Sequence, residues 1–553
     1  MDSDSEFFKY SKQIAEKFLQ STVVIDDRAI FPGPGAEPVA DKMAPPVKRP
    51  PTGRPVEEKK AHIAKPGKAT ISEEQRHLDA KKVVDGFAAR GIVCSVIKPY
   101  KDERGALLEY IYRLASNADV IVIDWVMQKD DGELALDLMK QIVTGDLSGR
   151  APLRLIAIYT IDPDVERIPE RIKTFLEQSG IPSISLTEED PFTIKIGPIR
   201  IVVLSKPGTD IPQEALIQQV SFEDLANRLT TEFTDMTAGL ISNVVIDSLA
   251  ELRANCHKII ATFSADLDAP YLTHRTLSPN PEDAEDHIVA LIGAELSTLL
   301  EEREVRKRAN IDAIKYWIEN KRPGSATFVL NAHGSTCELT KENVIQLLEK
   351  GISNVDRSDY SGRLSRTDFQ SPHAIKLSKM YHCDDMSSEN LDERFAELFT
   401  LKSFYGKPNP RLNLGTIIKA INSNIHYICI QPRCDCVRIT QDTDFVFLPL
   451  TIETGSGKFN IVIKDNDSYV RFKTNKRINS ITLIKFPANS QGSDAIVASE
   501  DAGSYYFQDT KRVKYKWIGE LRGDQALRLS NEFSSELSRV GLNESEWLRR
   551  HAK

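Results

Sequence analysis

The chain has 553 residues, of which 41% are hydrophobic and 27% charged, with a formal net charge of -8. This length exceeds a single hydrophobic core and predicts two or three domains. The acidic balance argues against a generally nucleic-acid-binding surface. No apolar run approaches the roughly 20 residues that span a bilayer, and the N-terminus, MDSDSEFFKYSKQ, is acidic where a signal peptide is basic. Seven cysteines, an odd number, fit reduced thiols. We therefore expect a cytoplasmic protein with no membrane segment.

The first part of the chain alternates helical and strand-like patterns. Residues 6–20 predict an amphipathic helix that leads into a buried strand at 21–25. Residues 31–72 are rich in Pro, Ala, Lys and Gly, which predicts a flexible insertion. The next predicted elements are helices at 73–90, 102–116, after Gly132 and at 164–179, and strands at 92–97, 119–124, 153–159 and 199–205. A hairpin that turns at Gly197-Pro198 precedes the last strand. This alternation predicts an α/β fold with a doubly wound, five-stranded parallel sheet covered on both faces.

The pattern changes after this sheet. Residues 212–320 place apolar residues at helical spacing. Residues 325–553 mix helices with four predicted strands, in ITQDTDFVFLPLTIET, KFNIVIKD, SYVRFKT and ITLIKF, and end in a long helical pattern. We therefore expect an α/β domain at 1–235 with the Pro-rich insertion at 31–72, a helical connector at 236–324, and an α+β domain at 325–553.

Polar residues follow four of the predicted strands directly. They are Asp26 and Asp27, Asp124, Thr160 and Lys206. Because the carboxyl ends of parallel strands face one shared crevice, we expect these side chains to meet there. Carboxylates can hold a divalent cation and one of them can accept a phosphoryl group, which a lysine would neutralise.

The order of these residues resembles the receiver domains of bacterial two-component signalling. Receivers carry an acidic pair after strand one, a phospho-accepting Asp after strand three, Thr or Ser after strand four, and Lys-Pro after strand five. Here Lys206 is followed by Pro207, and Asp131-Gly132 stands seven and eight residues past Asp124, where receivers commonly have Asp-Gly. The resemblance covers roughly residues 20–235 and implies a CheY-like, flavodoxin-like fold.

The resemblance also implies a role for each residue. Asp124 would be the phospho-acceptor, with Thr160 and Lys206 contacting the phosphoryl oxygens. Mg²⁺ would be held by Asp26, Asp27, Asp124 and the backbone carbonyl of Val126. The implied partner is a sensor histidine kinase. Each residue taken singly also fits a purely structural role, since an acidic pair can cap a helix, Thr commonly ends a strand and Lys is commonly solvated.

The chain departs from the receiver pattern at several positions. The aromatic switch residue expected three positions before the lysine is Val203, and the proline expected four positions after the acceptor is Gln128. Ile161 follows Thr160 where a small residue is common, which narrows access to the phosphate. These changes leave the phosphorylation chemistry in place but put the usual aromatic-coupled output in doubt.

Other candidate sites lie in the C-terminal part. Two of them invite a zinc interpretation, although buried-strand or loop roles are favoured for both. They are the set His426, Cys429, Cys434 and Cys436, and the run His382-Cys383-Asp384-Asp385. His333 in LNAHGST has no accompanying nucleophile motif. The basic runs KRPPTGRPVEEKK and REVRKR are interpreted as a solvated loop and a helix face.

The favoured function is a phospho-accepting regulator without enzymatic output. The whole chain resembles the non-enzymatic receiver protein of the Detocs anti-phage phosphorelay, which is thought to draw off stray phosphate from a second receiver that is fused to an effector. The alternative is an effector enzyme in residues 325–553 that phosphorylation activates. A DNA-binding regulator is disfavoured by the acidity and by the missing helix-turn-helix. An oligomer is compatible with the sequence.

Overall fold

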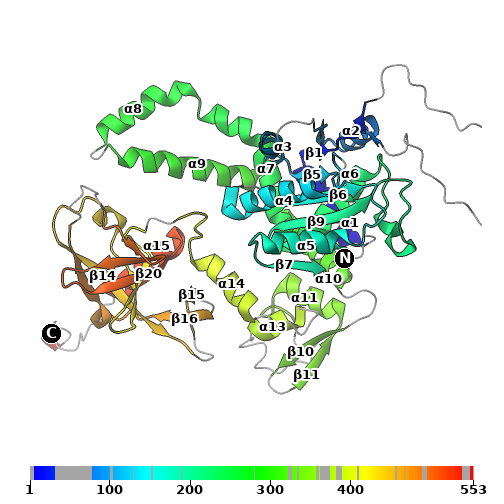
Figure 1. The fold of residues 1–553 in the computed structure, drawn as a ribbon. Coiled ribbons are helices and arrows are strands. Elements are labelled where there is room, and N and C mark those ends of the chain that lie inside the picture. The colour runs from blue at the N-terminus through cyan, green and yellow to red at the C-terminus, as the bar shows by residue number, and fades with distance from the viewer. Residues whose placement is uncertain are drawn as a thin grey trace, which may run out of the picture. The chain divides into compact units, whose positions relative to one another are not determined.

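The computed structural model of the chain describes residues 5–31, 77–99, 104–128, 130–150, 153–187, 190–278, 281–321, 327–332, 335–356, 360, 374–381, 389–407, 410–454, 458–465, 468–488, 495–537 and 549–551. The chain divides into two compact units, Met1–Ala326 and Thr327–Lys553 (Figure 1). Apart from Phe31, the predicted insertion at 31–72 lies outside the described residues.

The first unit contains an α/β sheet and a set of long helices. Its strands are β1 (Ser21–Ile25), β2 (Ala29–Ile30), β3 (Leu78–Asp79), β4 (Val93–Ile97), β5 (Val120–Ile123), β6 (Arg154–Thr160), β7 (Ile184–Thr187), β8 (Asp190–Ile196) and β9 (Ile199–Ser205). Its helices are α1 (Glu6–Phe18), α2 (Ala80–Ala88), α3 (Arg104–Ala115), α4 (Glu133–Gly145), α5 (Ile168–Gln178), α6 (Leu225–Thr237), α7 (Leu240–Thr262), α8 (Asp268–Leu277), α9 (Asp283–Glu302) and α10 (Ile311–Lys321). Shorter helical turns are η2 (Asp146–Arg150), η3 (Gln213–Gln218), η4 (Ala265–Leu267) and η5 (Val305–Ala309).

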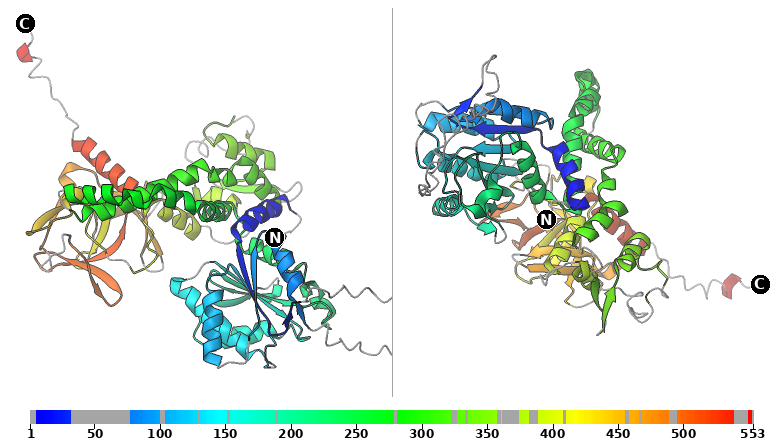
Figure 2. Two further views of the ribbon diagram at one scale, coloured as in Figure 1. Left: turned by 90° about the horizontal axis from the view of Figure 1, so that it is seen from above. Right: turned by 90° about the vertical axis from the view of Figure 1, so that its right-hand side faces the viewer.

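The main sheet has the strand order β4-β1-β5-β6-β9-β8-β7. The first five strands in this order pair in parallel, in the 2-1-3-4-5 order of flavodoxin-like folds. Helices lie on both faces of the sheet (Figures 1 and 2). α3, α4 and α5 supply the apolar core on one face, and α1, α2, α6 and part of α7 supply it on the other. The predicted doubly wound α/β fold is therefore confirmed.

The sheet is wider than its five parallel strands. The predicted hairpin is present, because β8 pairs antiparallel with β9 around Gly197, whose φ of +56° suits the turn. β7 adds a seventh strand, antiparallel to β8, that the sequence did not reveal. The segment ISLT is short and only partly buried, so its apolar pattern was too weak to identify.

The helix predicted at 73–90 begins later than expected. Leu78 and Asp79 form the short strand β3, which pairs with β2, and α2 starts at Ala80. The Asp79 side chain accepts a hydrogen bond from the Lys82 N–H, as an N-cap residue does. The apolar pattern of the helix continues into Leu78 and Asp79, so the pattern alone does not show that these residues form a strand and an N-cap.

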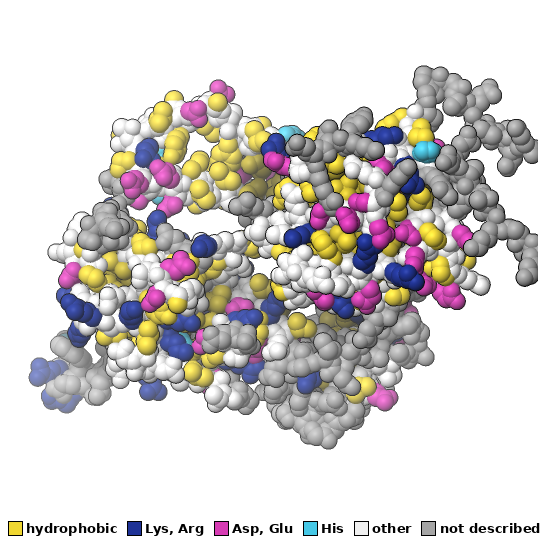
Figure 3. All heavy atoms as spheres, in the orientation of Figure 1, with side chains coloured by type: hydrophobic (Ala, Val, Ile, Leu, Met, Phe, Trp, Pro, Cys, Tyr) yellow, Lys and Arg dark blue, Asp and Glu magenta, His cyan; other side chains and the backbone are white. Residues whose placement is uncertain are grey.

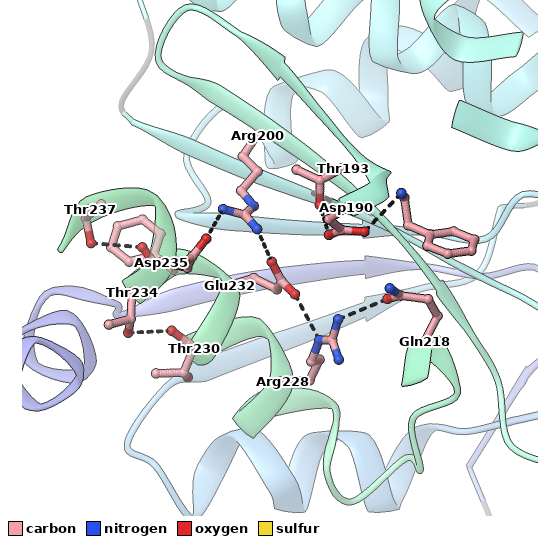
Figure 4. A network of polar contacts seen from close by, with 12 residues as sticks. Asp190, Thr193, Arg200, Gln218, Arg228, Thr230, Glu232, Thr234, Asp235 and Thr237 are labelled. Carbon is pink, nitrogen blue, oxygen red and sulfur yellow. Dashed lines mark hydrogen bonds and ion pairs between the residues drawn. The ribbon is translucent and has the colours of Figure 1, made fainter. Parts of the chain in front are cut away.

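α6 is fixed to the sheet by a buried ionic network (Figure 4). Arg200 of β9 donates to Glu232 and Asp235 of α6, each at 2.7 Å. Arg228 donates to the other oxygen of Glu232 at 2.9 Å and to Gln218 at 2.9 Å. Because each arginine bonds two different side chains through directional, charge-assisted hydrogen bonds, α6 sits in one orientation on the face of the sheet.

The second unit is rich in antiparallel strands. A nine-stranded sheet is formed by β12 (Thr416–Ala420), β13 (His426–Cys429), β14 (Thr443–Ile452), β15 (Ile461–Asp465), β16 (Ser468–Thr474), β17 (Thr482–Phe486), β18 (Ser499–Asp501), β19 (Ser504–Gln508) and β20 (Lys514–Glu520). The other elements are the hairpin β10 (Phe328–Ala332) and β11 (Ser335–Leu339), the helices α11 (Lys341–Lys350), α13 (Ala374–Tyr381), α14 (Glu389–Thr400) and α15 (Gly523–Leu537), and the short turns η7 (Arg433–Asp435) and η8 (Ile478–Ser480). The four strands predicted here are present as β14 to β17. None of the helices in the described parts of the chain has the length and apolarity needed to cross a bilayer.

Candidate functional site

The strand register brings the predicted site residues to one edge of the main sheet. Ile25 pairs with Ile123, Ile123 with Ile158, and Ile158 with Val203, so these four form one apolar row. Asp26 and Asp124 directly follow the first two of them. Thr160 and Lys206 lie two and three residues beyond the last two. The polar residues therefore share the carboxyl edge, as expected for a parallel sheet.

Lys206 lies between two of the three carboxylates. Its Nζ is 2.7 Å from Oδ2 of Asp26 and 3.0 Å from Oδ2 of Asp124. The first contact is a hydrogen bond and the second is an ion pair, while Oδ1 of Asp124 has no hydrogen-bond partner. All three side chains are at most 2% exposed. The sheet edge therefore holds a buried ammonium between two buried carboxylates.

Burial shifts the protonation of this group. Desolvation raises the pKa of Asp124 to about 7. The Lys206 ammonium lowers this pKa, but burial and the negative charges of Asp26 and Asp27 raise it by more. Burial alone would lower the pKa of Lys206, but the charges of Asp124 and Asp26 outweigh it and the pKa is raised. Lys206 is therefore a fixed cation, while Asp124 is poised to gain or lose a proton near neutral pH.

The three aspartates fit a divalent cation. Carboxylate oxygens of Asp26, Asp27 and Asp124 lie within 4.8 Å of one another. Oδ1 of Asp27 and Oδ1 of Asp124 are buried acceptors without a hydrogen-bond partner. Three carboxylates and one ammonium, that of Lys206, leave a formal charge of -2, which one Mg²⁺ would offset. Hard oxygen ligands of this kind are those that Mg²⁺ prefers.

Gln128 replaces the expected proline and has a structural consequence. Its backbone N–H donates to Oδ2 of Asp27 at 2.7 Å, a hydrogen bond that a proline cannot make. Gln128 has a φ of +52°, a conformation that is costly for a side chain other than glycine. The loop after Asp124 therefore accepts local strain while it orients the Asp27 carboxylate.

Thr160 is fully buried at the end of β6. Its Oγ1 accepts a hydrogen bond from the Asp162 N–H at 3.0 Å, and its carbonyl accepts one from the Lys206 N–H at 2.8 Å. Because the Asp162 contact uses Oγ1 as an acceptor, the hydroxyl proton is left to donate. Thr160 and Lys206, the two residues expected to contact the phosphoryl group, are thus joined by a backbone hydrogen bond.

A tryptophan that sequence reasoning overlooked supports the loop after Asp124. Gly132 has a φ of +81°, and a Cβ there would lie 2.3 Å from the ring of Trp125, which is 1% exposed. Arg171 of α5 lies over that ring, with its Cζ 5.4 Å from the centroid, and pairs with Asp131 at 2.7 Å. The Asp-Gly pair thus packs against Trp125 and joins the loop to α5. The position of Trp125, next to the acceptor, was the available signal.

The remaining receiver-derived predictions have different outcomes. Val203 is fully buried in the core beneath the carboxylates. An apolar residue therefore fills the position at which receivers carry the aromatic switch residue. Nothing in the geometry tests the Val126 carbonyl as a metal ligand, and that assignment stays a prediction. Ile161 is half-buried beside the edge.

The C-terminal candidates do not converge on a metal. Among the described residues, the group Asp26, Asp27 and Asp124 is the only set of three or more His, Cys, Asp or Glu side chains close enough to share an ion. Cys429 is buried in the apolar core, as predicted for the strand YICI; Cys436 is buried there too, whereas Cys434 is exposed. Burial lowers the pKa of His426 to about 4, with a contribution from Lys419. His333 and the run His382-Cys383-Asp384-Asp385 lie outside the described residues.

Comparison with known proteins agrees with the N-terminal site. Residues 18–210 match the family model of the response receiver domain. This range is less than half of the chain and contains Asp26, Asp27, Asp124, Thr160 and Lys206. Neither the curated proteins nor the solved structures contain a match to the chain. The match supports a receiver domain over this range and does not extend to residues 211–553.

Proposed function

We propose that the chain is a phospho-accepting response regulator in which Asp124 takes a phosphoryl group from a sensor histidine kinase. The observation that carries this proposal is the position of Lys206 Nζ, 2.7 Å from Asp26 and 3.0 Å from Asp124. A buried ammonium beside an acceptor carboxylate offsets the charge that arrives with a phosphoryl group. The receiver match over residues 18–210 supports the same assignment.

The reaction requires Asp124 as a carboxylate. One of its oxygens forms a bond to phosphorus while the bond from phosphorus to the kinase imidazole nitrogen breaks, and that nitrogen regains its electron pair. Lys206 and the Thr160 hydroxyl then contact the phosphoryl oxygens. Asp26, Asp27, Asp124 and the Val126 carbonyl are the proposed ligands of Mg²⁺. When bound, this ion supplies positive charge that favours ionised Asp124 and offsets the charge on the phosphoryl group.

We assign the output of the protein to phosphate buffering in an anti-phage phosphorelay in the bacterial cytoplasm. In this role the chain draws phosphate from the kinase and protects a second receiver-effector protein from accidental activation. The buried Val203 supports a receiver without the usual aromatic output. Anti-phage defence rests on the resemblance of the whole chain to the Detocs receiver protein. The alternative is an effector enzyme in residues 325–553, and expression separates the two, because a phosphorylated effector is toxic whereas a buffer is harmless and its loss is harmful.

Phosphorylation with acetyl phosphate and Mg²⁺ tests the acceptor assignment. The wild-type chain should gain one phosphoryl group and Asp124→Ala none. Asp164→Ala is the matched control, because Asp164 lies in the loop after β6 and its side chain is 47% exposed. It should label like wild type. Equal labelling of the wild type and Asp124→Ala would contradict the proposal, and chelation with EDTA should abolish labelling of the wild type.

A further inference from the structure

The helices that follow the α/β sheet expose a large apolar surface. We call α7, η4, α8 and α9, residues 240–302, the arm. Its exposed apolar residues are each between 43% and 77% exposed. They are Ile241, Val245, Leu249, Ile260, Leu267, Leu272, Leu277, Val289 and Leu291. Figure 3 shows hydrophobic side chains gathered over the α8 and α9 part of the arm.

The size of this surface is that of an interface. The nine exposed fractions amount to about five fully exposed aliphatic residues, on the order of 300–600 Å² of apolar side-chain surface. A stable homodimer buries about 800 Å² per partner, of which roughly two thirds is apolar. The arm therefore offers the apolar area that one such interface needs, and an apolar surface of this size is often a binding site.

The sequence of α9 also indicates an interface. Between Ile288 and Leu300 the only charged residue is Glu295, and a helix that is apolar on all sides is normally buried. In this chain, however, Ala284 and Leu299 are the only buried residues of α9. α9 contacts α7, α8 and η5, and these contacts leave most of its side chains at least partly exposed.

The base of the arm is held firmly. Asp247 of α7 pairs with Lys17 at 2.8 Å and with Arg308 at 2.9 Å. Further along α7, Arg253 pairs with Asp119 at 3.0 Å. These contacts join the lower half of α7 to α1, η5 and the start of β5. The apolar surface is thus presented in a fixed geometry, which reduces the ordering entropy that binding costs.

We propose that the arm pairs antiparallel with the arm of a second copy of this chain. α7 and α9 have 23 and 20 residues, about 30–35 Å of helix, so two arms are long enough to pack side by side as a four-helix bundle. Such a pairing is isologous and closes on itself, which buries both apolar surfaces at once.

The charges on the arm favour the same partner. Asp266 and Asp268 are exposed where α8 begins, and Glu282 is exposed at the turn between α8 and α9, which is the tip of the arm. Figure 3 shows acidic side chains over the α8 and α9 part of the arm. They disfavour an anionic lipid surface or a nucleic acid. Antiparallel pairing brings this tip to the base of the other arm, where the basic run 303–308 lies. Within that run Arg306 is exposed and has no ion pair among the described residues.

Molecular mass in solution tests the pairing. Sedimentation velocity on the full chain should give a dimer at micromolar concentration. The double variant Ile260→Glu/Val289→Glu replaces side chains that are 70% and 68% exposed, so it should fold. Each change occurs twice in an isologous interface, so we expect dissociation to become at least about 100-fold easier. The matched control is Ile217→Glu, in η3 outside the arm and 72% exposed, which should remain dimeric.

Amide hydrogen exchange provides a second measurement. Peptides from α7 and α9 should be more protected at high than at low protein concentration in the wild type and equally protected at both in the double variant. A wild type that stays monomeric, or a double variant that stays dimeric with a wild-type circular dichroism spectrum, would overturn the proposal. Both results are independent of phosphorylation at Asp124.

Discussion

Asp124→Asn should stabilise the protein, and by more as the pH rises. In the folded state burial raises the pKa of Asp124 to about 7 from its ordinary value of 3.8. Between these two pKa values the Asp124 carboxyl is protonated in the folded state and ionised in the unfolded state. The stability of the wild type therefore falls as pH rises from about 4 to about 7. A difference of roughly three pKa units corresponds to about 4 kcal/mol, which is an upper value because Asp124 is strongly coupled to Lys206. Asparagine cannot ionise and avoids this loss.

Scanning calorimetry of both proteins between pH 4.5 and 8 in EDTA would measure the effect. The two unfolding temperatures should nearly coincide at the acid end, and the variant should unfold higher at the alkaline end, by several degrees. Added Mg²⁺ should narrow the gap, because the ion favours ionised Asp124. Asp85→Asn, at a side chain that is 61% exposed on α2, is the control and should show no pH-dependent gain. A variant that is equally or less stable at pH 8 would refute the reasoning.

Three further predictions concern neighbouring residues. Lys206→Met removes the ammonium between two buried carboxylates and should destabilise the fold by about 3–5 kcal/mol at neutral pH, measured by denaturant unfolding; a loss below 1 kcal/mol would contradict the ion-pair account. Gly132→Ala should lower the unfolding temperature clearly more than Gly180→Ala. The two glycines have nearly the same φ, +81° and +82°, but only at Gly132 would a Cβ clash with a ring, that of Trp125. Equal decreases in unfolding temperature would count against this contact. The phosphorylated form should decay slowly, since Val126, two residues past the acceptor, cannot position an attacking water; a half-life of seconds by mass spectrometry would exclude this.

The parallel sheet could be predicted because its strands are buried on both faces. VVI, VIVI and LIAI read as continuous apolar runs, and a polar residue ends each run. The order of those polar residues then predicted which strand ends meet. What the residue types could not supply is the contact geometry. Nothing in the sequence indicated that Lys206 bonds to Asp26 as well as pairing with Asp124, or that Gln128 donates to Asp27 through its backbone.

Weak local patterns account for the elements that were missed. β7 has four residues, of which three are partly buried and one is exposed, and β2 and β3 consist of two residues each, so neither periodicity nor composition marks them. The arm presents the opposite difficulty. Its apolar periodicity predicted helices correctly, but the same pattern arises whether a helix packs on its own domain or on another molecule. Only the exposure of Val289 and its neighbours distinguishes these cases.

In the proposed reaction Asp124 carries the phosphoryl group. Borohydride reduction after treatment with acetyl phosphate and Mg²⁺ tests it most directly, because it converts an aspartyl phosphate, and not a free aspartate, into homoserine at the modified position. Peptide sequencing by mass spectrometry should find homoserine at residue 124 in the wild type and none in a sample treated without the phosphodonor. Homoserine at Asp26 or Asp27 instead, or at no position in a chain that had gained a phosphoryl group, would contradict the account.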